Sequence, residues 1–208
     1  MLQTGSTKKI PTRTSSLCSF RLVTRHLAIH RSGQFRNAVL SFAVETLKVK
    51  HVVVLGHYGC GGIAESMMPI NGPLTRPADI AVQRWIQPIR QIYESSSRTE
   101  IVAHREACKH SPLTKLPDLH DPAFRAMVEE NVKSNVRKVA ESAVIQDHYT
   151  YVLEKNGNPA TLENKTEHVA KVLIHGWVYD VETGKVSDLG VSVGPPGRRL
   201  PASPFPLV

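Results

Sequence analysis

The feature that most constrains this sequence is a short apolar run that leads directly into a glycine-rich loop. Residues 52–55 are three valines and a leucine, and the loop that follows, residues 56–62, contains four glycines. A β-branched run of this length is typical of a buried strand in a parallel sheet. Ligands of open α/β sheets bind at the carboxyl ends of such strands, so the loop is a candidate binding site.

The loop carries an imidazole and a thiol three residues apart, His57 and Cys60. The glycines around them allow the backbone to fold tightly, so both side chains can converge on one point. Nitrogen and sulfur donors together suit zinc. The sequence therefore predicts that His57 and Cys60 bind zinc. The alternative is a buried histidine at the end of a strand beside an inert cysteine.

Several stretches resemble the beta-class carbonic anhydrases. The loop Gly56-His57-Tyr58-Gly59-Cys60-Gly61-Gly62, which follows a helical segment and a hydrophobic strand, is similar to the second metal-binding segment of that family. Weaker similarities cover residues 22–28, 130–132 and 175–185. The resemblance implies a zinc-dependent enzyme that hydrates carbon dioxide reversibly to bicarbonate through zinc-bound hydroxide. It also implies a homodimer or a higher oligomer.

The chain departs from the family at the first metal-binding segment. The family takes a third ligand, a cysteine, from a Cys-x-Asp-x-Arg segment on an interior strand, and that motif does not occur in this sequence. Without that strand, neighbouring strands should keep unpaired backbone groups. Cys18, in Leu17-Cys18-Ser19-Phe20-Arg21, is the candidate replacement for the ligand, although it lies only seven residues before Arg25.

Two further interpretations of this departure stay open. The chain is either a catalytically impaired family member that acts as a non-catalytic partner of a complete subunit, or its amino-terminal end is truncated or misassembled. With the aspartate and arginine of the motif missing, no catalytic residue other than the metal ligands is assigned from the sequence.

The length of 208 residues suits one domain with its own core. We expect a basic tail over residues 1–20, a beta-carbonic-anhydrase-like domain over 21–194 and a proline-rich tail over 195–208. No acidic residue precedes Glu45, so the first segment has the composition of a disordered basic tail or of an organelle transit peptide. Three cysteines favour a reducing compartment. We therefore expect a cytoplasmic protein, with a mitochondrial location as the alternative.

The net charge of +8 invites a nucleic-acid hypothesis. The basic excess gathers at the amino end, however, without an aromatic or recognition-helix pattern beside it. No apolar run approaches the length of a membrane span. We expect carbon dioxide and bicarbonate as partners, no nucleic acid and no membrane.

The polar segment 95–121 holds three histidines whose spacing matches no compact metal site, and we expect them to be solvated: His104, His110 and His120.

The pattern predicts an α/β fold with a mainly parallel sheet flanked by helices and an antiparallel edge hairpin near the carboxyl end. Helices are expected at 38–47, with Asn37 as the N-cap, and at 63–68, 78–93, 100–109 and 123–143, and strands at 20–28, 52–55, 169–179 and 186–193. Residues 182–185 should form the tight reversal of the hairpin. In the first helix, four apolar residues at helical spacing should cover the sheet: Leu40, Ala43, Val44 and Leu47.

Overall fold

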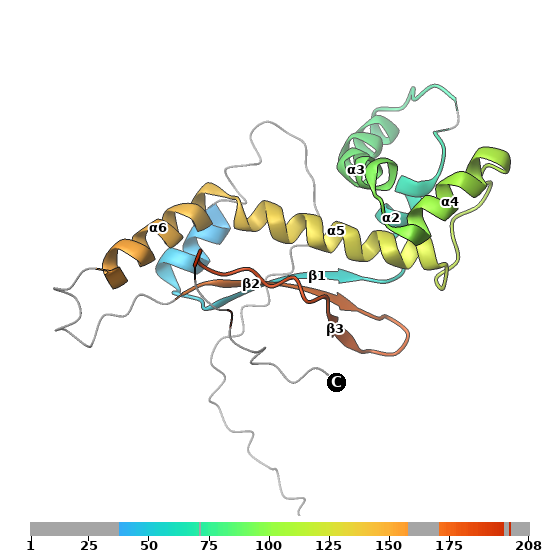
Figure 1. The fold of residues 1–208 in the computed structure, drawn as a ribbon. Coiled ribbons are helices and arrows are strands. Elements are labelled where there is room, and N and C mark those ends of the chain that lie inside the picture. The colour runs from blue at the N-terminus through green and yellow to red at the C-terminus, as the bar shows by residue number, and fades with distance from the viewer. Residues whose placement is uncertain (1–37, 71, 158–170, 198–199, 201–208) are drawn as a thin grey trace, which may run out of the picture.

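The computed structural model describes residues 38–70, 72–157, 171–197 and 200 (Figure 1). After a helical turn at residues 38–41 the elements are, in chain order, η1 (Phe42–Thr46), β1 (His51–His57), α2 (Gly61–Met67), α3 (Pro77–Ser95), α4 (Thr99–His110), α5 (Pro122–Ala140), α6 (Ala143–Gly157), β2 (Leu173–Tyr179) and β3 (Val186–Asp188). The tail predicted over residues 1–20 and the strand predicted over 20–28 lie outside the described residues. None of the described helices combines the length and the apolar character that crossing a membrane requires.

The described sheet has three strands in the order β1-β2-β3. β1 and β2 are parallel, in a register that runs from His51 opposite Leu173 to His57 opposite Tyr179. β2 and β3 are antiparallel, and an isolated bridge joins Ile174 to Val193 beyond them. The predicted α/β fold, with a parallel pair and an antiparallel edge hairpin, is confirmed.

Helix α5 is the central element of the core and lies along the two parallel strands (Figure 1). Its amino end is fixed by Pro122 in the first turn and by the carboxylate of Asp121, which accepts a hydrogen bond from the Phe124 amide at 2.9 Å. Its apolar face packs on the inward side chains of the sheet in one cluster: Val52, Val54, Ile174, Val178, Met127, Val128, Val132 and Val136.

Two strand glycines allow this helix to approach the sheet closely. A Cβ atom at Gly176 would lie 2.6 Å from Val191 Cγ2, 3.0 Å from Val136 Cγ2 and 3.2 Å from Val132 Cγ1. A Cβ atom at Gly56 would likewise meet the Val132 side chain. Real Cβ atoms essentially never come within 3.0 Å of such neighbours, so any larger residue at either position forces the helix and the sheet apart.

Two predicted helices differ from the structure. The helix expected over 123–143 ends at Ala140, and a separate helix, α6, that the sequence analysis did not predict follows it. Glu141 ends α5 by donating its amide to Arg137 O, and the Ser142 hydroxyl donates to Val139 O at 2.6 Å. α6 is tied to the residue before β2, where Tyr149 Oη donates to Val172 O at 3.0 Å.

The first helix also differs in the face that it buries. Ala43 and Val44 are buried as predicted, but Leu47 is 51% exposed. The Leu47 amide donates to Phe42 O, five residues back, at 2.9 Å, so the segment makes a π-helical turn. This wider turn shifts Leu47 away from the stripe that a spacing of 3.6 residues predicts.

We expect the substitution Gly176→Ala to destabilise the fold by about 2 kcal/mol, because the new methyl group overpacks the contact between the helix and the sheet. Gly61→Ala is the matched control, since a Cβ there would meet nothing within 4 Å. Urea unfolding of both variants measures the two free energies. Equal stability of the two variants would contradict the close approach.

Candidate metal centre

His57 is the last residue of β1, and its side chain is exposed. Its Nδ1 atom lies 3.2 Å from the carbonyl oxygen of Tyr58. A carbonyl oxygen only accepts hydrogen bonds, so the neutral imidazole must carry its proton on Nδ1 to make this contact. The contact therefore leaves the Nε2 lone pair available for a metal ion.

Cys60 lies three residues further on, at the amino end of α2, and is half-buried. Its carbonyl oxygen accepts the amides of Ile63 and Ala64, each at 3.0 Å, which fixes the start of the helix. Between the two candidate ligands, Gly59 has φ +78°, a backbone conformation that favours glycine. The predicted tight loop is therefore present, and Gly59 makes its turn.

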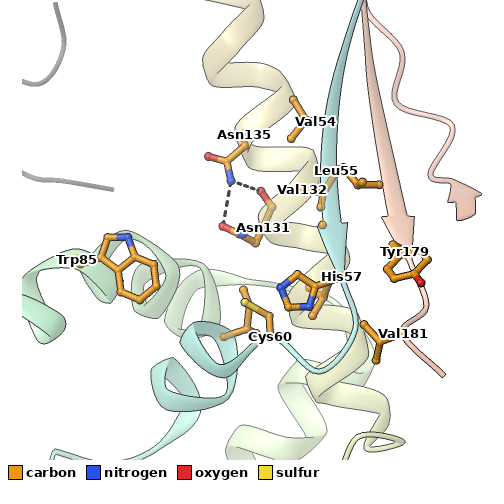
Figure 2. Close-up of a pocket in the computed structure, with 13 residues that line it drawn as sticks. Val54, Leu55, His57, Cys60, Trp85, Asn131, Val132, Asn135, Tyr179 and Val181 are labelled. Atoms are coloured by element: carbon orange, nitrogen blue, oxygen red, sulfur yellow. Dashed lines mark hydrogen bonds between the residues drawn. The ribbon is translucent and has the colours of Figure 1, made fainter. Parts of the chain in front are cut away.

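His57 and Cys60 line one cavity of about 520 Å³ at the carboxyl end of β1. Figure 2 shows both side chains near the lower end of α5, with Trp85 across the cavity. The remaining walls come from β1, α2, α5, the end of β2 and the turn after it, namely Val54, Leu55, Gly56, Ile63, Val128, Asn131, Val132, Asn135, Tyr179 and Val181. The structure thus brings the two predicted ligands to a common, largely apolar space.

Two amide side chains, one helical turn apart on α5, add polar groups to the cavity wall. Asn131 and Asn135 are 9% and 4% exposed. Asn135 Nδ2 donates to the Asn131 carbonyl oxygen at 2.9 Å and is 3.3 Å from its Oδ1 (Figure 2). Buried amides are stable only when they find hydrogen-bonding partners, so these side chains suit a small polar ligand or water in the cavity.

Tyr58, between the two candidate ligands, belongs to a polar network that the sequence analysis missed. It is buried, and its hydroxyl donates to Glu129 Oε1 at 2.7 Å. The other Glu129 oxygen accepts from the Arg98 guanidinium. On the ring face of Tyr58, the Arg125 guanidinium lies 3.5 Å from the ring centroid.

This network ties the loop to three distant parts of the chain. Arg125 also donates to Asp180 Oδ2 at 3.2 Å, just after β2. Burial, and then the hydrogen bond to Glu129, raises the pKa of Tyr58 to about 12. With its middle residue anchored in the protein, the loop directs His57 and Cys60 into the cavity. No local sequence pattern marks these partners, because they come from the residue before α4, from α5 and from the β2–β3 turn.

A third metal ligand is not present in the described part of the chain. No group of three or more histidine, cysteine, aspartate or glutamate side chains that could hold a metal occurs within residues 38–70, 72–157 and 171–197. Cys18, the replacement suggested by the sequence, lies outside this part. The described residues therefore supply two candidate donors, His57 and Cys60.

Comparisons with known proteins show the family of the chain. The family model for carbonic anhydrase matches residues 17–186. A carbonic anhydrase of Emericella nidulans is 30% identical over 156 residues, which cover 74% of this chain and 51% of that protein. Carbonic anhydrase 1 of Escherichia coli O157:H7 is 30% identical over 151 residues, which cover 73% and 52%.

Solved structures of the same class were also matched. A tetrameric beta-carbonic anhydrase of Sordaria macrospora is 20% identical with a TM-score of 0.49, covering 77% of this chain and 62% of that one. A beta-carbonic anhydrase of Aspergillus fumigatus is 27% identical with a TM-score of 0.47, covering 78% and 59%.

The family model covers most of the chain, and the fold is the α/β arrangement described above. It belongs to the beta-class carbonic anhydrase family. The chain spans about half the length of the curated relatives it matches.

We expect Tyr58→Phe to lower the free energy of unfolding by about 1 kcal/mol at neutral pH, because Glu129 loses a hydrogen-bond donor. The pH dependence has a definite sign. Unfolded tyrosine ionises near pH 10, whereas folded Tyr58 stays neutral to about 12. The difference in free energy of unfolding between the parent and the variant is therefore largest below pH 10, and it is lost as the pH rises toward 12. Urea unfolding of both proteins at pH 8 and pH 11 measures this difference. The same difference at both pH values would count against the network.

Proposed function

We propose that this chain is a zinc-dependent carbonic anhydrase that hydrates carbon dioxide reversibly to bicarbonate. The observation that carries the proposal is the convergence of His57 and Cys60 on one cavity at the carboxyl end of β1. An imidazole nitrogen and a thiolate are donors that zinc takes. A catalytic zinc generally has three protein ligands and one open position. His57 and Cys60 would supply two of those three ligands.

Zinc bound there would supply a water of lowered pKa, close to ~7, which is the nucleophile that hydration of carbon dioxide needs. The chain's own residues supply the rest of the environment. The Tyr58 carbonyl keeps the proton of His57 on Nδ1. Apolar side chains on β1 and α5, among them Val54, Val128 and Val132, suit an uncharged gas. The amides of Asn131 and Asn135 offer hydrogen bonds to the more polar bicarbonate.

We also propose that the chain assembles as a homodimer or a higher oligomer. Its first helical segment keeps large apolar side chains on the outside, with Val39, Phe42 and Leu47 between 46% and 55% exposed. Such a patch is typical of a surface that another subunit covers. A role as a non-catalytic partner of a complete subunit is the competing proposal, and no contact within the described residues favours it.

Removal of both candidate ligands tests the proposal. We expect the double variant His57→Ala, Cys60→Ser to lose nearly all bound zinc and all activity, because neither donor remains. Elemental analysis of the purified protein measures the metal, and stopped-flow hydration of carbon dioxide measures the activity. Cys108→Ser is the matched control, since Cys108 is a free cysteine on α4, away from the loop.

Two results would contradict parts of this proposal. Unchanged zinc content in the double variant would show that the loop holds no metal. A parent protein with zinc but without hydration activity would favour the non-catalytic partner over the enzyme.

A further inference from the structure

Trp85 of α3 packs against the start of α2, the helix that begins directly after Cys60. A Cβ atom at Gly62 would lie 2.9 Å from Trp85 Cη2 and 3.2 Å from Cζ3, so the six-membered ring of the indole rests on the glycine itself. Gly62 is not among the described glycines with positive φ. The close approach of the ring, and not the backbone conformation, therefore requires a glycine at this position.

Helix α3 also holds the other end of α2. Arg90 Nη1 donates to Met68 O at 2.6 Å, and Nη2 donates to Glu65 O at 3.3 Å. α3 itself is anchored in the protein by two buried side chains, Ile86 and Ile89. One helix therefore contacts α2 at both of its ends.

The position of Cys60 follows from the position of α2. Cys60 is the N-cap residue of this helix, and its side chain makes no capping hydrogen bond. Its carbonyl oxygen accepts the amides of Ile63 and Ala64, so its backbone is part of the first turn, to which Gly62 also belongs. The place of the thiol in the cavity is therefore set by where this turn rests, and the turn rests on Trp85.

We propose that Trp85 is a positioning residue for Cys60. The inference deepens the proposed function and rests on it. In Figure 2, Cys60 lies between Trp85 and His57, and all three line the cavity. By supporting the first turn of α2, the indole holds the thiol within reach of a metal ion that His57 also binds.

The distances show that a small change at this contact is enough to disturb a metal site. Ordinary contacts of a Cβ atom begin at 3.4 Å, so a methyl group on Gly62 would be about 0.5 Å too close to the ring. Binding and catalytic sites must be held within about 0.5 Å of their productive geometry. A displacement of this size in the first turn of α2 is therefore sufficient to weaken zinc binding.

A role for Trp85 in packing alone makes a different prediction. The buried face of α3 is formed by Ile86 and Ile89, whereas Trp85 is half-buried and lines the cavity. A residue that only packs would change the stability of the fold. In a folded variant it would change neither the affinity for zinc nor the reactivity of Cys60.

Two substitutions of opposite size test the proposal. We expect Gly62→Ala to push the turn away from the ring, and Trp85→Phe to leave the turn unsupported, because phenylalanine has no atoms at the outer positions of the indole. Each single variant should bind zinc about 10-fold to 100-fold more weakly, measured by competition with a chromophoric chelator. The double variant Gly62→Ala, Trp85→Phe should recover most of the affinity, because the methyl group fills the space that the smaller ring leaves. Gly61→Ala is the matched control, since a Cβ there would meet nothing within 4 Å.

Two further measurements report on the thiol itself. In cobalt-substituted protein, the near-ultraviolet absorption of a thiolate bound to Co²⁺ should fall in both single variants and return in the double variant. In metal-free protein, iodoacetamide should alkylate Cys60 faster in the single variants, because the half-buried thiol becomes more accessible. The rate should return toward that of the parent in the double variant, and mass spectrometry of the Cys60 peptide measures it.

Losses of zinc affinity that add up in the double variant would overturn the proposal. The same loss in Gly61→Ala as in Gly62→Ala would also overturn it. Zinc affinity and alkylation that stay unchanged in every variant would remove this role from Trp85 and leave the proposed function intact. A parent that binds no zinc, but whose Cys60 alkylation shows the pattern of rescue, would refute the proposed function and support the positioning of the thiol.

Discussion

The close approach of α5 to the two parallel strands is the constraint on which the rest of the structure depends. Gly56 and Gly176 lie on the strand faces beneath the helix, and Val132 meets both positions. This approach does more than form the core. It brings Asn131 and Asn135 to the wall of the cavity and Glu129 to the hydroxyl of Tyr58. One helix therefore sets both the packing of the sheet and the surroundings of the candidate metal centre.

The loop after β1 is held through the side chain of Tyr58, which lies between the two candidate ligands. Tyr58 donates to a carboxylate that also pairs with Arg98, and Arg125 covers its ring. Hydrogen bonds to a charged group are stronger than those between neutral groups, so this anchor restrains the loop without a metal ion. The side chains of His57 and Cys60 line the cavity. Restraint of this kind lowers the entropic cost of bringing two donors to one ion.

The sequence could predict what depends on local pattern. The apolar run at 52–55, the glycine loop with His57 and Cys60, and the reversal at 182–185 gave the parallel pair, the candidate ligands and the edge hairpin, because each is coded by neighbouring residues. Contacts across long separations gave no local signal. The network around Tyr58 joins residues far apart in the chain. His104 was predicted to be solvated, and this was wrong, because its Nδ1 lies 2.8 Å from the Tyr93 hydroxyl of the preceding helix.

The absence of the family motif leaves the candidate metal centre with two donors among the described residues, His57 and Cys60. A strand bearing Cys-x-Asp-x-Arg would supply both a zinc ligand and backbone partners for its neighbour, and this chain has no such motif. A third ligand must come within reach of the cavity that His57 and Cys60 line. Zinc that binds only when this ligand and the loop are both ordered would stabilise the ordered form, since a ligand that binds one form shifts the equilibrium toward it.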